Sequence, residues 1–216
     1  ILENDSKVTA TFKIAANTQD MYYLNGVTVS GSHIVFHKKL GWIDVKDHPF
    51  AKKKENYNEE IIYCLNTTEK RIHINNMIFM DWDELTPTDM MKLKLGKFIP
   101  MQGGYENIHK YMESGFSKDT IIELQNGKKI NISDVKPNDI LVNNEKVIAT
   151  VCINGKDLDN IQEYTFGNQK IIGGHNLFLK HRDLGNFSTL GFKGKKVKRN
   201  TLYHLITDTE SFQIEN

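Results

Sequence analysis

Three stretches near the start of this 216-residue chain recur later in the same order, and this internal repeat constrains the fold more than any other feature. The first pair is residues 7–14 (KVTATFKI) and 146–153 (KVIATVCI), at an offset of 139. The other pairs, at offsets of 142 and 140, are residues 30–36 (SGSHIVF) with 172–178 (IGGHNLF), and 62–67 (IYCLNT) with 202–207 (LYHLIT). Three matches in one order at nearly one offset predict a duplicated module.

The two copies differ at their ends. The second copy has a leading stretch, residues 116–142, for which the first copy has no counterpart, whereas the first copy continues beyond the position that matches residue 216. We therefore predict a module at residues 1–85 that lacks its opening segment, a connector at 86–113, and a module at 114–216 that lacks its last strand.

Short apolar runs separated by turn dipeptides predict a mostly β fold. The runs lie at residues 8–14, 27–36, 42–45, 60–65, 71–79, 120–124, 146–153, 170–179 and 201–207. Asn126-Gly127, between two β-prone runs, is the clearest hairpin signal in the chain. Helix is favoured only within the connector, so we expect two β modules joined by a short, partly helical connector.

Composition excludes several classes of function. The 28 basic and 27 acidic side chains give a net charge of +1, which predicts no broad surface for nucleic acid or anionic membranes. No stretch approaches the length of a membrane span. Cys64 and Cys152 lack the spacing of metal ligands, so we expect no metal, no cofactor and no disulfide framework, and a reducing intracellular compartment or a virion as the location.

The order of several motifs resembles the Hint family, the autoprocessing domains of hedgehog proteins and inteins. Residues 115–141 resemble the opening segment of that family, which ends in a hairpin and a turn. Ser30-Gly-Ser-His33 and Ile172-Gly-Gly-His175 resemble its Thr-x-x-His block, and the stretches that begin at Tyr63 and Tyr203 resemble its closing block. Together these motifs cover about four-fifths of the chain.

The resemblance implies a set of candidate catalytic residues. In the family, a thiol or hydroxyl attacks the carbonyl of its own preceding peptide bond, and the Thr-x-x-His pair polarises that amide. The residues that match family positions, or offer a thiol near them, are Ser30, His33, Cys64 and His175. The nucleophile position, however, aligns with Gly115, which has no side chain.

Further departures leave neither copy with a complete catalytic set. Ile172 stands where the family has Thr, and Asp81-Trp82 replaces the terminal His-Asn. His33 also fits a histidine bonded within a β core, and Cys64 fits a small buried apolar residue. His33 and His37 could form a metal pair but lack a third ligand, and we expect Asp81, Asp83 and Glu84 to form a solvated acidic turn.

Three functions follow as hypotheses. The first is a structural protein made of catalytically degenerate Hint-like modules, within a larger assembly such as a viral particle. Its open β edges would then pair with other protein chains. The alternative is a self-cleaving or protein-splicing fragment, a single-turnover activity, and the third is a β module that binds a small ligand or carbohydrate.

Overall fold

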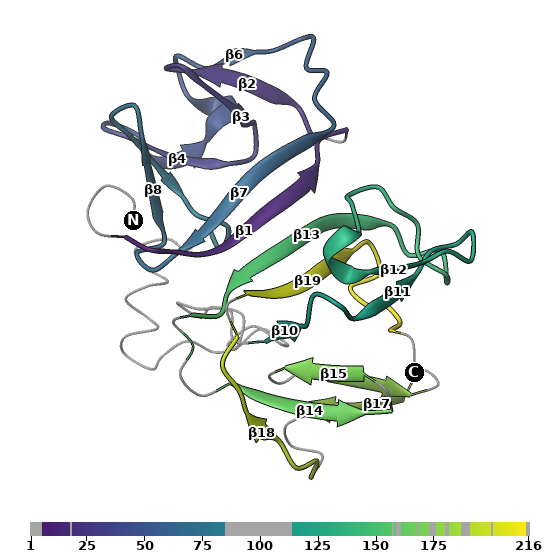
Figure 1. The fold of residues 1–216 in the computed structure, drawn as a ribbon. Coiled ribbons are helices and arrows are strands. Elements are labelled where there is room, and N and C mark those ends of the chain that lie inside the picture. Colours follow the sequence, from purple (N-terminus) through teal and green to yellow (C-terminus); the bar gives the residue numbers. More distant parts are fainter. Residues whose placement is uncertain are drawn as a thin grey trace. The chain divides into compact units, whose positions relative to one another are not determined.

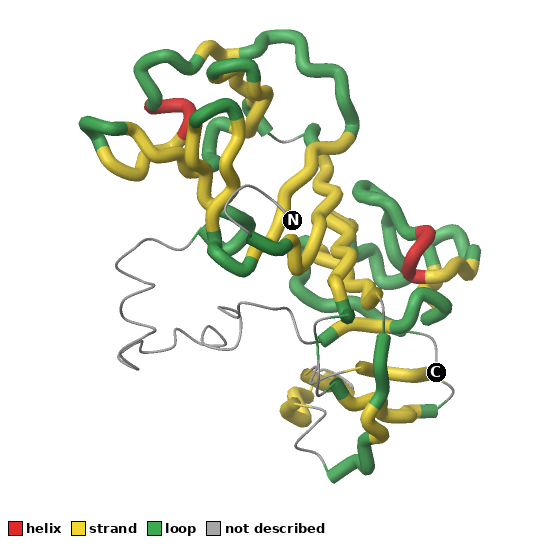
Figure 2. The backbone as a smooth tube through the Cα atoms, turned by 60° about the vertical axis from the view of Figure 1, so that its left-hand side comes forward, coloured by secondary structure: helices red, strands yellow, loops and turns green. Residues whose placement is uncertain are grey.

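The computed structural model describes residues 6–17, 19–84, 114–156, 158, 161–167, 169–172, 176–179, 182–186, 191–199 and 201–214. The fold is mostly β, as predicted, and the strands pair antiparallel (Figures 1 and 2). Within this part of the chain, helical residues form the 3-10 turns η2 (Val45–Asp47) and η3 (Ile132–Asp134). The predicted connector at 86–113 lies outside the described residues.

The chain divides into two units. Unit 1 comprises Ile1–Thr9 and Ala16–Tyr111, and unit 2 comprises Ala10–Ala15 and Met112–Asn216. The boundary passes through strand β1 (Val8–Ala15), most of which belongs to unit 2.

Unit 1 contains two small sheets and one long strand. The three-stranded sheet has the order β3-β2-β6, and the four-stranded sheet has the order β5-β4-β9-β8. The long strand, β7, is the end strand of a third, eight-stranded sheet and leads into β8. Their bounds are β2 (Met21–Leu24), β3 (Val27–Ser30), β4 (Ile34–His37), β5 (Gly41–Asp44), β6 (Lys52–Lys53), β7 (Ile61–Thr67), β8 (Arg71–Ile74) and β9 (Met77–Met80).

Apolar side chains from both small sheets form the core of unit 1. Leu24 of β2, Val35 of β4 and Phe79 of β9 are buried there, together with Val45 and Ile72. Because successive residues of a strand point to opposite faces, the residues between these core positions point away from this core.

Two runs expected as single strands are each divided in unit 1. The run at 71–79 is a hairpin, because Asn75 and Asn76 have φ values of 48° and 61° and turn the chain between β8 and β9. The run at 27–36 is interrupted at Gly31, whose N–H donates to the carbonyl of Asp20 (2.8 Å). A Cβ at Gly31 would lie 2.6 Å from the ring of Tyr22, so only glycine fits there.

Unit 2 is built around one large sheet and a hairpin. Seven strands of the eight-stranded sheet belong to it wholly or in large part, in the order β18-β14-β15-β10-β19-β13-β1, and β13 and β19 form the most extensive pairing (Figure 1). The strands are β10 (Gly115–Phe116), β11 (Ile121–Glu123), β12 (Lys129–Asn131), β13 (Val147–Asn154), β14 (Gln162–Phe166), β15 (Gln169–Ile172), β16 (Asn176–Leu179), β17 (Arg182–Asn186), β18 (Lys195–Lys196) and β19 (Thr201–Thr207).

The hairpin predicted at Asn126-Gly127 is confirmed. Strands β11 and β12 pair antiparallel, with Ile122 opposite Ile130, and Gly127 adopts a φ of 77°. Ile122 is buried in the core of unit 2, against residues of the large sheet such as Phe116 and Leu205. The opening segment is therefore packed onto the rest of unit 2.

Candidate functional site

Ser30 and His33 lie on a tight turn at the end of β3. The N–H of His33 donates to the carbonyl of Ser30 (3.1 Å), and the carbonyl of His33 accepts a hydrogen bond from the N–H of Val45 (2.8 Å). These two backbone bonds fix the turn between β3 and β4. The spacing that resembles the family motif therefore corresponds to one compact turn.

The His33 imidazole is largely buried beside an acidic segment, residues 81–84. Its Nδ1 lies 3.6 Å from Oε1 of Glu84, and its ring centroid lies 5.9 Å from that of Phe79. Burial lowers the pKa of His33, although a bond with the backbone of Met80 and the charge of Asp81 oppose that shift. The imidazole is therefore neutral at neutral pH and able to accept a proton only at lower pH.

Cys64 lies in the middle of β7, close enough to the same acidic segment to be influenced by its charges. Burial raises the pKa of its thiol to about 12; a weak bond to the Leu65 carbonyl opposes the rise, and the charges of Asp81, Glu84 and Asp83 add to it. A thiol with such a pKa is almost entirely protonated at neutral pH. Cys64 is therefore a poor nucleophile, in keeping with a small, partly buried residue.

The expectation of a solvated acidic turn is wrong for Asp81. This carboxylate is fully buried, and its Oδ2 accepts hydrogen bonds from the N–H (2.7 Å) and the hydroxyl (3.2 Å) of Thr67. Its Oδ1 accepts a bond from the N–H of Asp83 (3.2 Å). Asp81 therefore holds the residues after β9 against the end of β7.

Lys70 completes this buried cluster, and no pattern in the sequence predicted its burial. The side chain is 3% exposed, and Nζ lies 3.8 Å from Oδ2 of Asp81. Nζ also donates to Oδ1 of Asn66 (2.8 Å) and pairs with Asp83. Since a buried ammonium requires partners of opposite charge, the cluster is a structural ion network.

The position that aligns with the family nucleophile has no room for a side chain. Gly115 lies in β10 opposite Ile172 of β15, and Phe116 lies opposite Tyr203 of β19. A Cβ on Gly115 would be 2.8 Å from Cβ of Leu202 and 3.1 Å from the carbonyl oxygen of Tyr203. Because strand β19 contributes these atoms, any other residue at 115 would displace β10 or β19.

The last predicted site residue, His175, lies outside the described residues. Ile172, which replaces the family Thr, is fully buried. Of the four candidates, Ser30, His33 and Cys64 are all in unit 1, where the segment 81–84 contacts His33 and acts on Cys64 through its charges. Among the described residues, no three His, Cys, Asp or Glu side chains are grouped to hold a metal ion.

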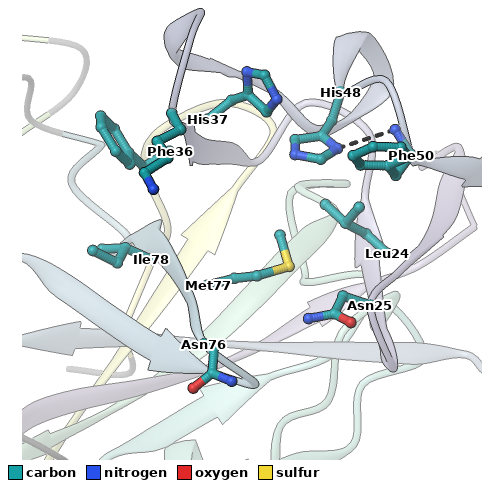
Figure 3. Close-up of a pocket in the computed structure, with 10 residues that line it drawn as sticks. Leu24, Asn25, Phe36, His37, His48, Phe50, Asn76, Met77 and Ile78 are labelled. Atoms are coloured by element: carbon teal, nitrogen blue, oxygen red, sulfur yellow. Dashed lines mark hydrogen bonds between the residues drawn. The ribbon is translucent and has the colours of Figure 1, made fainter.

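A pocket of about 590 Å³ in unit 1 was not predicted (Figure 3). Leu24 and Met77 extend toward its middle, the rings of His37 and His48 lie at one end, and Asn76 lies at the other. Asn25, Phe36, Lys38, Phe50 and Ile78 complete its lining. No spacing in the sequence marks this group, because it comes from four separate turns and strand ends.

The two histidines of the pocket pack against each other, with their ring planes almost perpendicular. Their ring centroids are 5.0 Å apart, so His37 pairs with His48 and not with His33. Nδ1 of His37 accepts the N–H of Leu40 and Nδ1 of His48 accepts the N–H of Phe50, both at 3.2 Å. In the neutral form of each ring the proton is therefore on Nε2. Burial, followed by the electrostatic interaction with His37, lowers the pKa of His48.

No family model, curated protein or solved structure matched the chain in the comparisons. None of the helices in the described residues is long and apolar enough to cross a membrane.

Proposed function

We propose that this chain is a structural protein made of two Hint-like β modules that have lost self-processing, and that its open strand edges pair with other protein chains. A larger assembly such as a viral particle is the setting we infer for it. The observation that carries the proposal is the packing at Gly115, where the nucleophile position is closed to any side chain.

The strand order supports a duplication. Strands β1 to β7 of the first copy correspond in order to β13 to β19 of the second, and β1 and β13 each have eight residues, as β7 and β19 each have seven. Hairpins β2–β3 and β4–β5 correspond to β14–β15 and β16–β17, and β6 pairs with β2 as β18 pairs with β14.

Two details support the same correspondence. After β7, Lys70 has a φ of 58°, and the hydroxyl of Thr67 accepts the N–H of Arg71 (3.2 Å). After β19, Glu210 has a φ of 57°, and the hydroxyl of Thr207 accepts the N–H of Ser211 (3.1 Å). In addition, β1 pairs with β13 so that Phe12 lies opposite Val151, its own counterpart in the alignment.

The chemistry of the site favours a structural role over autoprocessing. Acyl transfer requires a nucleophile with a substantial ionised fraction or a neighbouring base. Gly115 offers no nucleophile, and the pKa of Cys64, raised to about 12, leaves almost no thiolate. Ser30 and His33 match the block that polarises the amide, and they do not replace the missing nucleophile.

Intact mass spectrometry tests the loss of self-processing. Purified full-length chain is incubated for a day at pH 7 with dithiothreitol or hydroxylamine, which cleave thioesters and esters. We expect one unchanged mass. Fragments 1–114 and 115–216 would contradict the proposal, and their loss in a His33→Ala variant would assign the cleavage to the autoprocessing alternative.

A second candidate function, binding of a small molecule, is favoured by the pocket in Figure 3. Its apolar lining and the two Nε2–H donors suit an apolar ring that carries a hydrogen-bond acceptor. Acetophenone and toluene form a matched pair of probes, since toluene has no acceptor. In NMR titrations we expect acetophenone to shift the His37 and His48 ring signals more than toluene does, and equal or absent shifts would exclude this function.

A further inference from the structure

In unit 2, strand β10 fills the space between two other strands of the large sheet. It lies between β15 and β19, with Gly115 opposite Ile172 and Phe116 opposite Tyr203. Phe116 also packs against the rings of His204 and Phe212, with centroid distances of 5.7 and 5.6 Å. A small residue followed by an aromatic one therefore joins the two strands and covers the surface next to Tyr203.

The corresponding strands of unit 1 lack such a neighbour within the described residues. Strand β3 corresponds to β15 and is the end strand of the sheet β3-β2-β6. Strand β7 corresponds to β19 and is likewise an end strand. The positions that match Ile172 and Tyr203 are Ser30 and Tyr63.

The geometry of β7 identifies its open edge. The carbonyl of Leu65 accepts the N–H of Trp82 (2.9 Å), and the N–H of Thr67 donates to Asp81. Backbone groups of residues two apart point to the same edge of a strand, so those of Tyr63 face this same edge. In the described part of the chain, no backbone hydrogen bond to Tyr63 occurs on that edge.

The side chain of Tyr63 gives a second, independent indication. It is 72% exposed, whereas Tyr203 at the matching position is partly buried and packs against the core that includes Phe116. The ends of the two strands also approach one segment, residues 81–84: Nδ1 of His33, after β3, lies 3.6 Å from Oε1 of Glu84, and the carbonyl of Leu65 in β7 accepts the N–H of Trp82 (2.9 Å). An aromatic exposed beside unpaired backbone groups is typical of a surface that accepts a strand.

We propose that the edges of β3 and β7, next to Ser30 and Tyr63, form an acceptor site for an extended segment of another polypeptide, in which a small residue is followed by an aromatic one. The small residue lies opposite Ser30, and the aromatic residue covers Tyr63, as Gly115 and Phe116 do in unit 2. Main-chain hydrogen bonds supply the affinity, and the aromatic contact supplies the selectivity. This inference rests on the proposed function and names the site at which other chains would join.

The probe is a synthetic peptide with the sequence of residues 114–124 (SGFSKDTIIEL), labelled at its C-terminus and titrated with the full chain by fluorescence anisotropy. We expect saturable binding below about 1 mM. A Tyr63→Lys chain and a peptide with Phe116→Asp should each bind at least tenfold more weakly. Tyr23→Lys is the matched control, since Tyr23 is another exposed tyrosine of unit 1 but lies on β2, the middle strand of its sheet, and it should bind as the unchanged chain does.

The other outcomes of this titration test whether the acceptor site exists and which chain occupies it. No saturable binding, or equal weakening by Tyr63→Lys and Tyr23→Lys, would overturn the acceptor site. If light scattering shows a dimer that the peptide dissociates, the occupant is a second copy of this chain and a separate partner is excluded. Failure of peptide binding leaves the unchanged intact mass unaffected, so the site and the loss of self-processing are tested separately.

Discussion

Replacing Asp81 by Asn should strongly destabilise unit 1. The two oxygens of Asp81 accept hydrogen bonds from the N–H and hydroxyl of Thr67 and from the N–H of Asp83, and the charge offsets that of buried Lys70. Asparagine has a single acceptor oxygen, so at least one buried N–H loses its partner, at a cost of about 1–3 kcal/mol. Because Lys70 is also left with less opposite charge, we expect a total near 3–5 kcal/mol.

Intrinsic fluorescence measures this loss selectively, because both tryptophans of the chain, Trp42 and Trp82, lie in unit 1. In urea unfolding followed by this signal, the midpoint for Asp81→Asn should fall with an unchanged slope. The melting temperature should fall by roughly 6–20 °C, from about 2–4 °C per kcal/mol for a chain of this size.

Asp134→Asn is the matched control. Asp134 is an exposed carboxylate of unit 2 whose contacts are weak bonds to Asn131 and Ser133 (both 3.4 Å). Its replacement should change stability by less than about 0.5 kcal/mol. A loss below about 1 kcal/mol for Asp81→Asn would refute the view that the cluster holds the end of β7.

Three further predictions follow from the same structure. The variant Gly115→Cys should show no self-cleavage by intact mass, and calorimetry should show unit 2 less stable by about 1–3 kcal/mol. The control Ser117→Cys should leave the stability unchanged. Cleavage in Gly115→Cys would show that β10 tolerates a side chain. In labelling with a maleimide at pH 7, exposed Cys152 should react first, and partly buried Cys64, with its pKa raised to about 12, should react at least 100-fold more slowly. Similar rates would contradict the raised pKa of Cys64. Burial lowers the pKa of His33 and His204, so below about pH 6.5 the unfolded state binds more protons than the folded state. The free energy of unfolding should therefore fall as the pH drops below about 6.5, by at most about 1.4 kcal/mol per pH unit for each histidine. A melting temperature that is independent of pH from 7 to 5.5 would contradict this, and His204→Phe should reduce the slope.

The features that could be predicted from the sequence depend on local chemistry. The Asn126-Gly127 hairpin and the alternating runs were informative because turn residues and strand periodicity act over a few positions. The same reasoning overlooked Asn75-Asn76, since two asparagines within an apolar run look like part of one strand until both adopt positive φ. The mostly β fold therefore followed from the sequence, whereas two strand boundaries did not.

The features that could not be predicted depend on contacts between distant residues. Asp81 reads as part of a hydrophilic turn, and only the approach of Lys70 and Thr67 makes its burial possible. The pairing of His37 with His48 and the Leu24–Met77 pocket likewise arise from turns that meet in space. The resemblance singled out Ser30, His33 and Cys64, which all belong to unit 1, but the closed packing at Gly115 required coordinates.

Amide hydrogen exchange of the unmodified chain tests most directly whether one module is closed by its opening strand while the other has an open edge. The measurement compares residues 61–64 of β7 with residues 201–204 of β19 under the same conditions. We expect slow exchange throughout 201–204, because β10 and β13 flank β19, and fast exchange at alternate amides of 61–64. Equal protection of the two segments would contradict the account, since β7 would then already have a partner on its second edge.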